Sequence, residues 1–190
     1  MKLRLALTLA LFLFNLSWAQ SIKFLTLEEA LLLPADSVKH LTLSKKKLSD
    51  LPEILKQFKN LESLNLSRNK LSALPNWIDQ FSQLKYLDLD HNQLEIFPIP
   101  ITRLYNLEQL RMSNNRLTYL PDLLNQCKKL RVLDLYSNEI SNLGKGIYEL
   151  DKLENLDLSG TMYGTIFQKE LKQHLHWVNI KFDPPCTCLD

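Results

Sequence analysis

The stretch LKYLDLDHNQLEIFP, residues 84–98, places side chains of types that can do chemistry, Tyr86, Asp88, Asp90 and His91, between its leucines and around its asparagine. Neighbouring carboxylates can act as general acid and base in hydrolysis. Carboxylates with a nearby imidazole can also hold a divalent cation. Leu84, Leu87, Leu89 and Leu94 recur at short intervals around them, so the reactive side chains fill the gaps of an apolar frame. Their role depends on the elements that position them.

This frame repeats with a period of 23 residues. Because apolar residues alternate within each unit, every unit predicts a short strand with one buried face, followed by a turn. Six units without an insertion indicate a repeat protein whose units stack on one another. The repeating columns are Val38, Leu61, Leu84, Leu107, Leu130 and Leu153; Leu41, Leu64, Leu87, Leu110, Leu133 and Leu156; Leu43, Leu66, Leu89, Met112, Leu135 and Leu158; Asn69, Asn92, Asn115 and Asn138; and Pro52, Pro75, Pro98 and Pro121.

The consensus of these units, LxxLxLxxNxLxxLPxxIxxLxx, resembles the leucine-rich repeat family over residues 38–160, with units like those of small bacterial repeat proteins. The resemblance implies an α/β fold: a right-handed solenoid with a curved parallel β-sheet on its concave face and short helices or turns on its convex side. It also implies that the Asn amide hydrogen-bonds backbone groups inside the turn. The inward residues of the return leg are expected to be Ile54, Leu55, Trp77, Ile78, Leu123 and Leu124, with Cys127 in the next inward column.

Residues 1–19 indicate a secretory signal peptide. A short basic start precedes an apolar run from Leu5 to Leu16, and Ser17 and Ala19 are the small residues that a signal peptidase recognises. We therefore expect cleavage after Ala19 and export, with the mature protein secreted or held in the periplasm or cell envelope. The apolar run is short for a membrane span, so no span is expected after cleavage. An uncleaved signal acting as an anchor is the alternative.

Both ends of the array, residues 20–37 and 161–190, are expected to act as caps. Thr26-Leu-Glu-Glu29 is a capping box that predicts a helix running through Leu33. At the other end the repeat decays into a helical spacing of apolar residues and then into an alternating closing strand. The residues expected to cover the core are Leu27, Ala30 and Leu31 in the first cap, and Phe167, Leu171, Leu175, Val178, Ile180 and Phe182 in the second.

Charge and cysteine content argue against several classes of function. Without the signal peptide the chain has 21 basic and 21 acidic residues, so nothing favours nucleic acid or an anionic membrane as a partner. The three cysteines, Cys127, Cys186 and Cys188, make neither a disulfide framework nor a metal-ligand set. Cys186 and Cys188 could close a small loop or pair with another chain. No cofactor and no metal are expected, and the oligomeric state stays open.

In the implied solenoid the non-leucine residues of the strands point out from the concave face. Asp134 and Asp157 would lie near enough for glycosidase chemistry, but an open strip has no pocket to exclude water. Arg111 beside Asp88 and Asp134 would also hold them ionised. A divalent cation is disfavoured because a flat sheet face rarely supplies six oxygen ligands.

Aromatic, arginine and carboxylate side chains together are instead typical of protein-binding surfaces. We expect a non-enzymatic protein-binding module that recognises a protein or peptide with a basic or amphipathic segment. The alternative is a structural envelope component that self-associates through Trp77, Ile96, Tyr119 or the terminal cysteines. The expected partner-binding residues are Tyr86, Asp88, Asp90, His91, Arg111, Asp134 and Tyr136.

Overall fold

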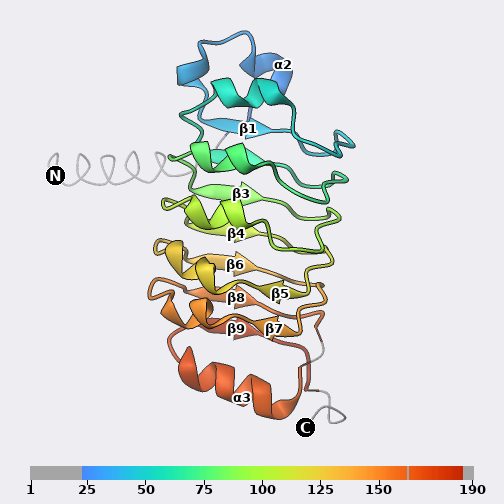
Figure 1. Ribbon diagram of the computed structural model, residues 1–190, viewed down its shortest axis with the longest axis vertical. Coiled ribbons are helices and arrows are strands. Elements are labelled where there is room, and N and C mark those ends of the chain that lie inside the picture. Colours follow the sequence, from blue (N-terminus) through green and yellow to red (C-terminus); the bar gives the residue numbers. More distant parts are fainter. Residues whose placement is uncertain (1–22, 162, 186–190) are drawn as a thin grey trace, which may run out of the picture.

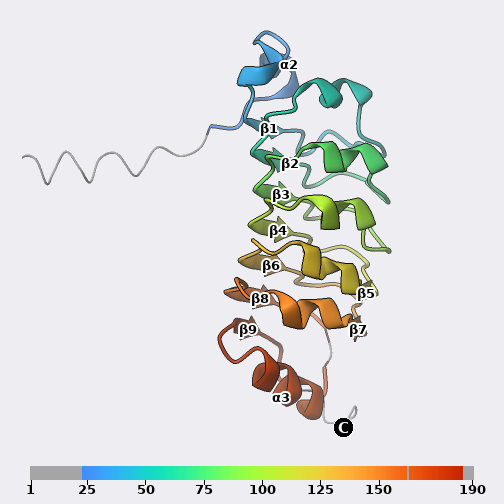
Figure 2. The same cartoon turned by 60° about the vertical axis from the view of Figure 1, so that its left-hand side comes forward.

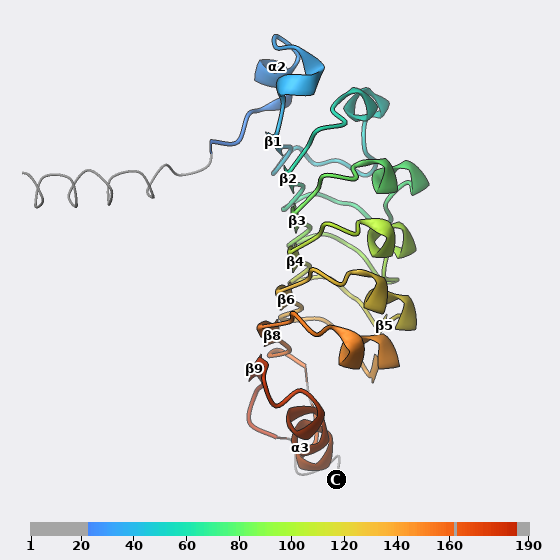
Figure 3. The same cartoon turned by 90° about the vertical axis from the view of Figure 1, so that its left-hand side faces the viewer.

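The computed structural model describes residues 23–161 and 163–185, which form a stack of similar coils (Figure 1). The predicted signal peptide lies outside the described residues, as do Cys186 and Cys188, for which the sequence leaves open both a small loop and pairing with another chain. Strands occupy one side of the stack and short helices the other, and Figure 3 shows that the line of strands bows inward, so the sheet face is concave. Within the described residues, no helix has the length and apolar character needed to cross a bilayer.

Seven strands form one parallel sheet in chain order, which confirms the predicted α/β fold with its parallel sheet. His40 pairs with Ser63, and Ser63 pairs with Tyr86, so neighbouring strands of the repeats are offset by one 23-residue unit. The closing strand is offset by 24 residues, with Asn155 opposite Asn179. The central residue of each repeat strand is an inward leucine, and burial of that leucine fixes the register. The strands are β1 (His40–Thr42), β2 (Ser63–Asn65), β3 (Tyr86–Asp88), β4 (Gln109–Arg111), β6 (Val132–Asp134), β8 (Asn155–Asp157) and β9 (Asn179–Lys181).

The return leg of each coil is a 3₁₀ helix (Figure 2), which begins directly after the proline column in four coils, as at Pro52 with φ −67°, and after Gly144 in the fifth. The proline has extended backbone and a fixed φ, so it turns the chain into the helix. A small parallel pair is formed by β5 (Tyr119–Leu120), which lies just before η6, and β7 (Asn142–Leu143), which lies just before η7. The 3₁₀ helices are η2 (Ala35–Ser37), η3 (Glu53–Gln57), η4 (Asn76–Gln80), η5 (Ile99–Arg103), η6 (Asp122–Gln126) and η7 (Lys145–Glu149).

In each expected inward pair on the return leg only the second residue is fully buried, although Trp77, the first residue of its pair, is partly buried and packs against the core. Leu55, Ile78 and Leu124 are fully buried, whereas Ile54 is 46% exposed and Leu123 is 45% exposed. A 3₁₀ helix has three residues per turn, so consecutive side chains diverge by about 120° and cannot share an inward face. The expectation that both residues point inward is wrong for Ile54 and Leu123. The next column is buried as predicted, with Cys127 a free thiol in the core.

The asparagine column joins successive coils. Asn92 accepts the N–H of Leu71 at 3.0 Å and donates to the carbonyls of Leu66 at 3.1 Å and Leu89 at 3.0 Å. The same bonds recur at Asn69, Asn115 and Asn138. The implied role of the amide is confirmed, and each amide also satisfies backbone groups of the preceding coil.

The N-terminal cap contains α2 (Leu27–Ala30), and the predicted capping box between Thr26 and Glu29 is present. The helix ends three residues earlier than expected, and Leu31 is 49% exposed, so it does not cover the first coil. The C-terminal cap contains α3 (Thr165–His174), with Leu171 buried against the last coil. Strand β9 then adds to the parallel sheet beside β8, as the alternation of its residues predicts.

Candidate functional site

One column of side chains on the concave face lies at the last residue of each repeat strand. At five of its six positions a side-chain oxygen accepts the backbone N–H two residues later, at 2.9–3.2 Å. Short polar side chains make this local bond readily, and it ends the strand in a turn. We refer to this set as the acceptor column. Its members are Thr42, Asn65, Asp88, Arg111, Asp134 and Asp157.

The turn after each strand places a residue in the left-handed region of backbone space. Three positions after each member of the acceptor column, φ lies between 53° and 79°. His91 is one of these residues, with φ 54°, and its backbone N–H donates to the carbonyl of Ser113 at 2.9 Å. Non-glycine residues adopt this conformation only where the surrounding bonds enforce it. The positions of Asp88 and His91, which their sequence proximity suggested for chemistry, are therefore explained by the turn.

Arg111 is the exception in the acceptor column because a guanidinium has no acceptor atom. The N–H of Ser113, two residues later, instead donates to Asp90 Oδ1 of the preceding coil at 2.7 Å. The Arg111 side chain is exposed, and among the described residues it makes no hydrogen bond and no ion pair. Asp90 thus supplies the acceptor that Arg111 lacks, and the Arg111 side chain is left available to a ligand.

Burial dominates the electrostatics of the carboxylates beside Arg111. Desolvation raises the pKa of Asp90, and the charge of Asp88 raises that pKa further, against the hydrogen bonds from Ser113. Desolvation also raises the pKa of Asp134, with the charges of Asp90 and Asp157 adding to it. Arg111 opposes both shifts only weakly. Arg111 is therefore not the main influence on the pKa of Asp134, because the half-buried carboxylate loses more hydration than the exposed guanidinium returns.

The seven expected partner-binding residues do not form one continuous pocket. Asp88 and Asp134 both pair in register with Arg111 across β3, β4 and β6. Asp88 is only 7% exposed and accepts a bond from the Tyr86 hydroxyl at 3.2 Å, whereas Tyr136 is 45% exposed. Arg111 and Asp134 line a depression of about 200 Å³ that continues towards β9. Tyr86 belongs instead to a separate pocket nearer the N-terminus.

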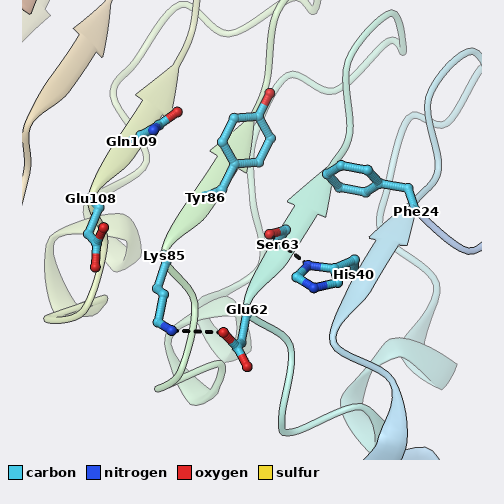
Figure 4. Close-up of a pocket in the computed structure, with 8 residues that line it drawn as sticks. All are labelled: Phe24, His40, Glu62, Ser63, Lys85, Tyr86, Glu108 and Gln109. Carbon is cyan, nitrogen blue, oxygen red and sulfur yellow. Dashed lines mark hydrogen bonds and ion pairs between the residues drawn. The ribbon is translucent and has the colours of Figure 1, made fainter. Parts of the chain in front are cut away.

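That second pocket, of about 340 Å³, is shown in Figure 4 and was missed in the sequence. Phe24, His40 and Tyr86 line it, together with residues at the N-terminal ends of β2 to β4. Leu25 forms a parallel bridge with Leu41, which brings Phe24 to the edge of the sheet. The 16-residue offset of this bridge departs from the 23-residue period, so the repeat pattern gives no signal for it.

The most suggestive catalytic pair on the concave face lies in this pocket. His40 Nδ1 and Ser63 Oγ are 3.0 Å apart, a distance typical of a base and its nucleophile. Ser63 is only 6% exposed, and no described group hydrogen-bonds the second nitrogen of His40 to orient the ring. The pair therefore lacks the third member of a nucleophile triad. Among the described residues, no cluster of three His, Cys, Asp or Glu side chains could hold a metal ion.

The geometry defines a class of protein: a repeat solenoid whose coils are joined by an asparagine ladder and whose parallel sheet presents an open concave surface. Comparison with known families agrees. Residues 36–94 match the family model described as leucine rich repeat, and residues 105–145 match the model of two leucine rich repeat copies. The chain belongs to the leucine-rich repeat family.

Among solved structures, the chain is similar to a leucine-rich repeat protein of Leptospira interrogans, with 31% sequence identity and a TM-score of 0.67. The match covers 84% of this chain and 47% of that protein, so this chain spans about half the length of its relative. No protein with a curated description matches the chain. Leucine-rich repeat domains generally bind proteins and are generally non-enzymatic, which sets the coarse class of function without naming a partner.

Proposed function

We propose that this chain is a non-enzymatic binding protein that recognises a protein or peptide through its concave face. One observation carries the proposal. Five members of the acceptor column serve the turns of the fold, whereas Arg111 does not, and its exposed guanidinium makes no hydrogen bond among the described residues. Arginine offers five N–H donors in a planar fork and is enriched in the energetic centres of protein interfaces.

The surroundings of Arg111 indicate which groups a partner would present. The guanidinium suits a carboxylate or a row of backbone carbonyls. Asp90 and Asp134, on either side of it, suit basic side chains, and Tyr136 offers an exposed aromatic ring. A segment that carries both basic and apolar residues, laid across β3, β4 and β6, would meet all of these groups. The partner-binding role of the seven expected residues thus centres on Arg111 and Tyr136.

We also propose that binding takes place outside the cytoplasm. The support is the sequence of residues 1–19, with its basic start, apolar run and small residues at Ser17 and Ala19. Export would place the mature protein, from Gln20 onward, in the periplasm, on the envelope or beyond the cell. Fractionation of the source cells, with sequencing of the N-terminus of the recovered protein, tests this directly.

Capture of partners by the mature protein tests the concave-face proposal. The test variant combines Arg111→Asn with Tyr136→Ala, since Asn65 shows that asparagine fits the acceptor column. The matched control is Arg116→Asn, which removes the same charge from an exposed residue that pairs with Glu95 at 3.6 Å outside the sheet. Envelope and culture fractions should yield a partner held by the wild type and by the control but lost by the test variant. Equal capture by all three would overturn the proposal.

The structural alternative has one specific observation in its favour. Ile96 is 64% exposed and lies in a groove of about 470 Å³ lined by residues 72–74, 93 and 95–100. Trp77 does not support it, because the indole packs edge-on against Phe81 at 6.0 Å and donates to Glu53 at 3.2 Å. Sedimentation of the mature protein over a range of concentrations tests this alternative, which requires self-association that Ile96→Ser abolishes.

A further inference from the structure

Three rings surround the N-terminal pocket of the concave face. The Phe24 ring lies 6.1 Å from the His40 ring and 6.2 Å from the Tyr86 ring, with interplanar angles of 61° and 63°. Figure 4 shows Phe24 and Tyr86 projecting over the same opening, with His40 beneath Phe24. Aromatic faces carry negative electrostatic potential and attract a cation placed within about 6 Å of the ring centre.

A column of residues with alternating charge lies at the N-terminal ends of the repeat strands, one residue before each strand begins. Glu62 binds Lys39 at 2.8 Å and Lys85 at 2.7 Å, and Glu154 binds Arg131 at 2.7 Å. Glu108 stands between Lys85 and Arg131 in this column, yet its carboxylate makes no ion pair and no hydrogen bond among the described residues. The column is Lys39, Glu62, Lys85, Glu108, Arg131 and Glu154.

The unpaired Glu108 carboxylate lines the same pocket as the three rings. Lys85 is the one cation among the lining residues, and Glu62 already holds its ammonium group, as the dashed line in Figure 4 shows. Burial lowers the pKa of His40, which favours the neutral ring despite the nearby charge of Glu62. The pocket therefore combines aromatic walls with the Glu108 carboxylate, which interacts electrostatically with Lys85 and Arg131 but forms no ion pair with either among the described residues.

We propose that this pocket binds a cationic side chain of the partner, a lysine or an arginine, with its charge against the rings of Phe24 and Tyr86 and a hydrogen bond to Glu108. The inference rests on the proposed function and names the group by which the partner is anchored at the N-terminal half of the concave face. Aromatic rings with a carboxylate are a recurring solution for recognising ammonium and guanidinium groups. Tyr86 takes part here through its ring face, since its hydroxyl is bonded to Asp88.

Titration of the mature protein with blocked amino acids, followed by NMR, tests the pocket without knowledge of the partner. The probes are N-acetyl-lysine N-methylamide, its arginine counterpart and the norleucine analogue, which matches lysine in shape without the charge. Lysine and arginine should shift the signals of Phe24, His40, Ser63 and Tyr86 in a saturable way, and norleucine should not. Glu108→Gln should weaken the lysine probe about five- to tenfold, as expected for loss of one charged hydrogen bond.

The matched control is Glu154→Gln, which removes the same charge from the same column two strands away. It should leave the lysine titration unchanged. Equal shifts with norleucine, no saturable shift with lysine, or equal weakening by both variants would each overturn the cationic pocket. Capture of the concave-face partner by the Glu108→Gln variant, in the experiment described for Arg111, separates the two proposals. Undiminished capture would refute the anchor and leave the Arg111 surface standing, while absence of any partner would refute the proposed function instead.

Discussion

Asp90 Oδ1 accepts the backbone N–H of Ser113 at 2.7 Å, across the boundary between two coils. In the other coils this N–H is bound within its own turn, by the residue two positions earlier. Arg111 occupies that position here and cannot accept a bond. Asp90 thus allows the array to carry an arginine at the centre of its concave face without leaving a buried amide unsatisfied.

Asp90→Ala should destabilise the fold by about 1–3 kcal/mol, because the N–H of Ser113 loses its acceptor in a place with little access to water. Adding Arg111→Asn should restore much of this loss, since asparagine closes the same turn at Asn65. Urea unfolding of the two single variants and the double variant measures the coupling. If the double variant were as unstable as Asp90→Ala alone, the compensation would be refuted.

Asn92→Ala should cost about 2–5 kcal/mol, since it leaves the N–H of Leu71 and the carbonyls of Leu66 and Leu89 without their amide partner. The comparison is Asn76→Ala, in which an exposed asparagine at the start of η4 is removed. That change should stay within about 0.5 kcal/mol. Unfolding curves in urea distinguish the two, and similar losses in both variants would argue against the asparagine ladder.

The acid stability of the protein should depend on Glu62. Hydrogen bonds from Lys39 and Lys85 lower the pKa of this carboxyl from 4.5 to about 2. Because the folded state binds this proton less readily than the unfolded state, the carboxylate stabilises the fold above pH 4.5, and that contribution is lost as the pH falls towards 2. Glu62→Gln should flatten this part of the stability curve. NMR titration should also show the pKa of Glu62 rising towards 4.5 when Lys39 and Lys85 are both changed to Met.

Cys127 should be inert in the native state. Its thiol is fully buried, and burial raises its pKa to about 12, so the reactive thiolate is scarce at neutral pH. In a background with Cys186→Ser and Cys188→Ser it is the only thiol. Ellman's reagent should then react in guanidinium chloride but not in buffer. Fast reaction of the folded protein would contradict the core position of this side chain.

The sequence predicts the repeat strands and their register because each strand has a leucine that only one register buries. The same reasoning placed Cys127 correctly, since its column holds bulky apolar residues in the other coils. It failed at the return leg, where Ile54 and Leu123 were assigned to the core. An apolar pair does not reveal whether the chain will form a 3₁₀ helix, and that geometry decides which of the two residues is buried.

The candidate sites were harder to predict than the frame. The sequence placed Arg111 and Tyr136 on the exposed face by alternation alone. It gave Asp88 a binding role, although this carboxylate is bonded to the N–H of Asp90 at 3.0 Å and to Tyr86 at 3.2 Å. Alternation therefore predicts which side chains face outward, whereas the hydrogen bonds that engage them are seen only in the structure.

By itself the sequence determined the solenoid, its 23-residue register and its open polar face, because burial and periodicity act on each unit alike. Only the tertiary structure decided what departs from the period. Phe24 reaches Tyr86 through a bridge with its own offset, and Asp90 accepts a bond from a turn of the next coil. Among the described residues Glu108 forms no ion pair, while Glu62 binds Lys85 and Glu154 binds Arg131. Each of these depends on distances between coils, which spacing along the chain does not specify.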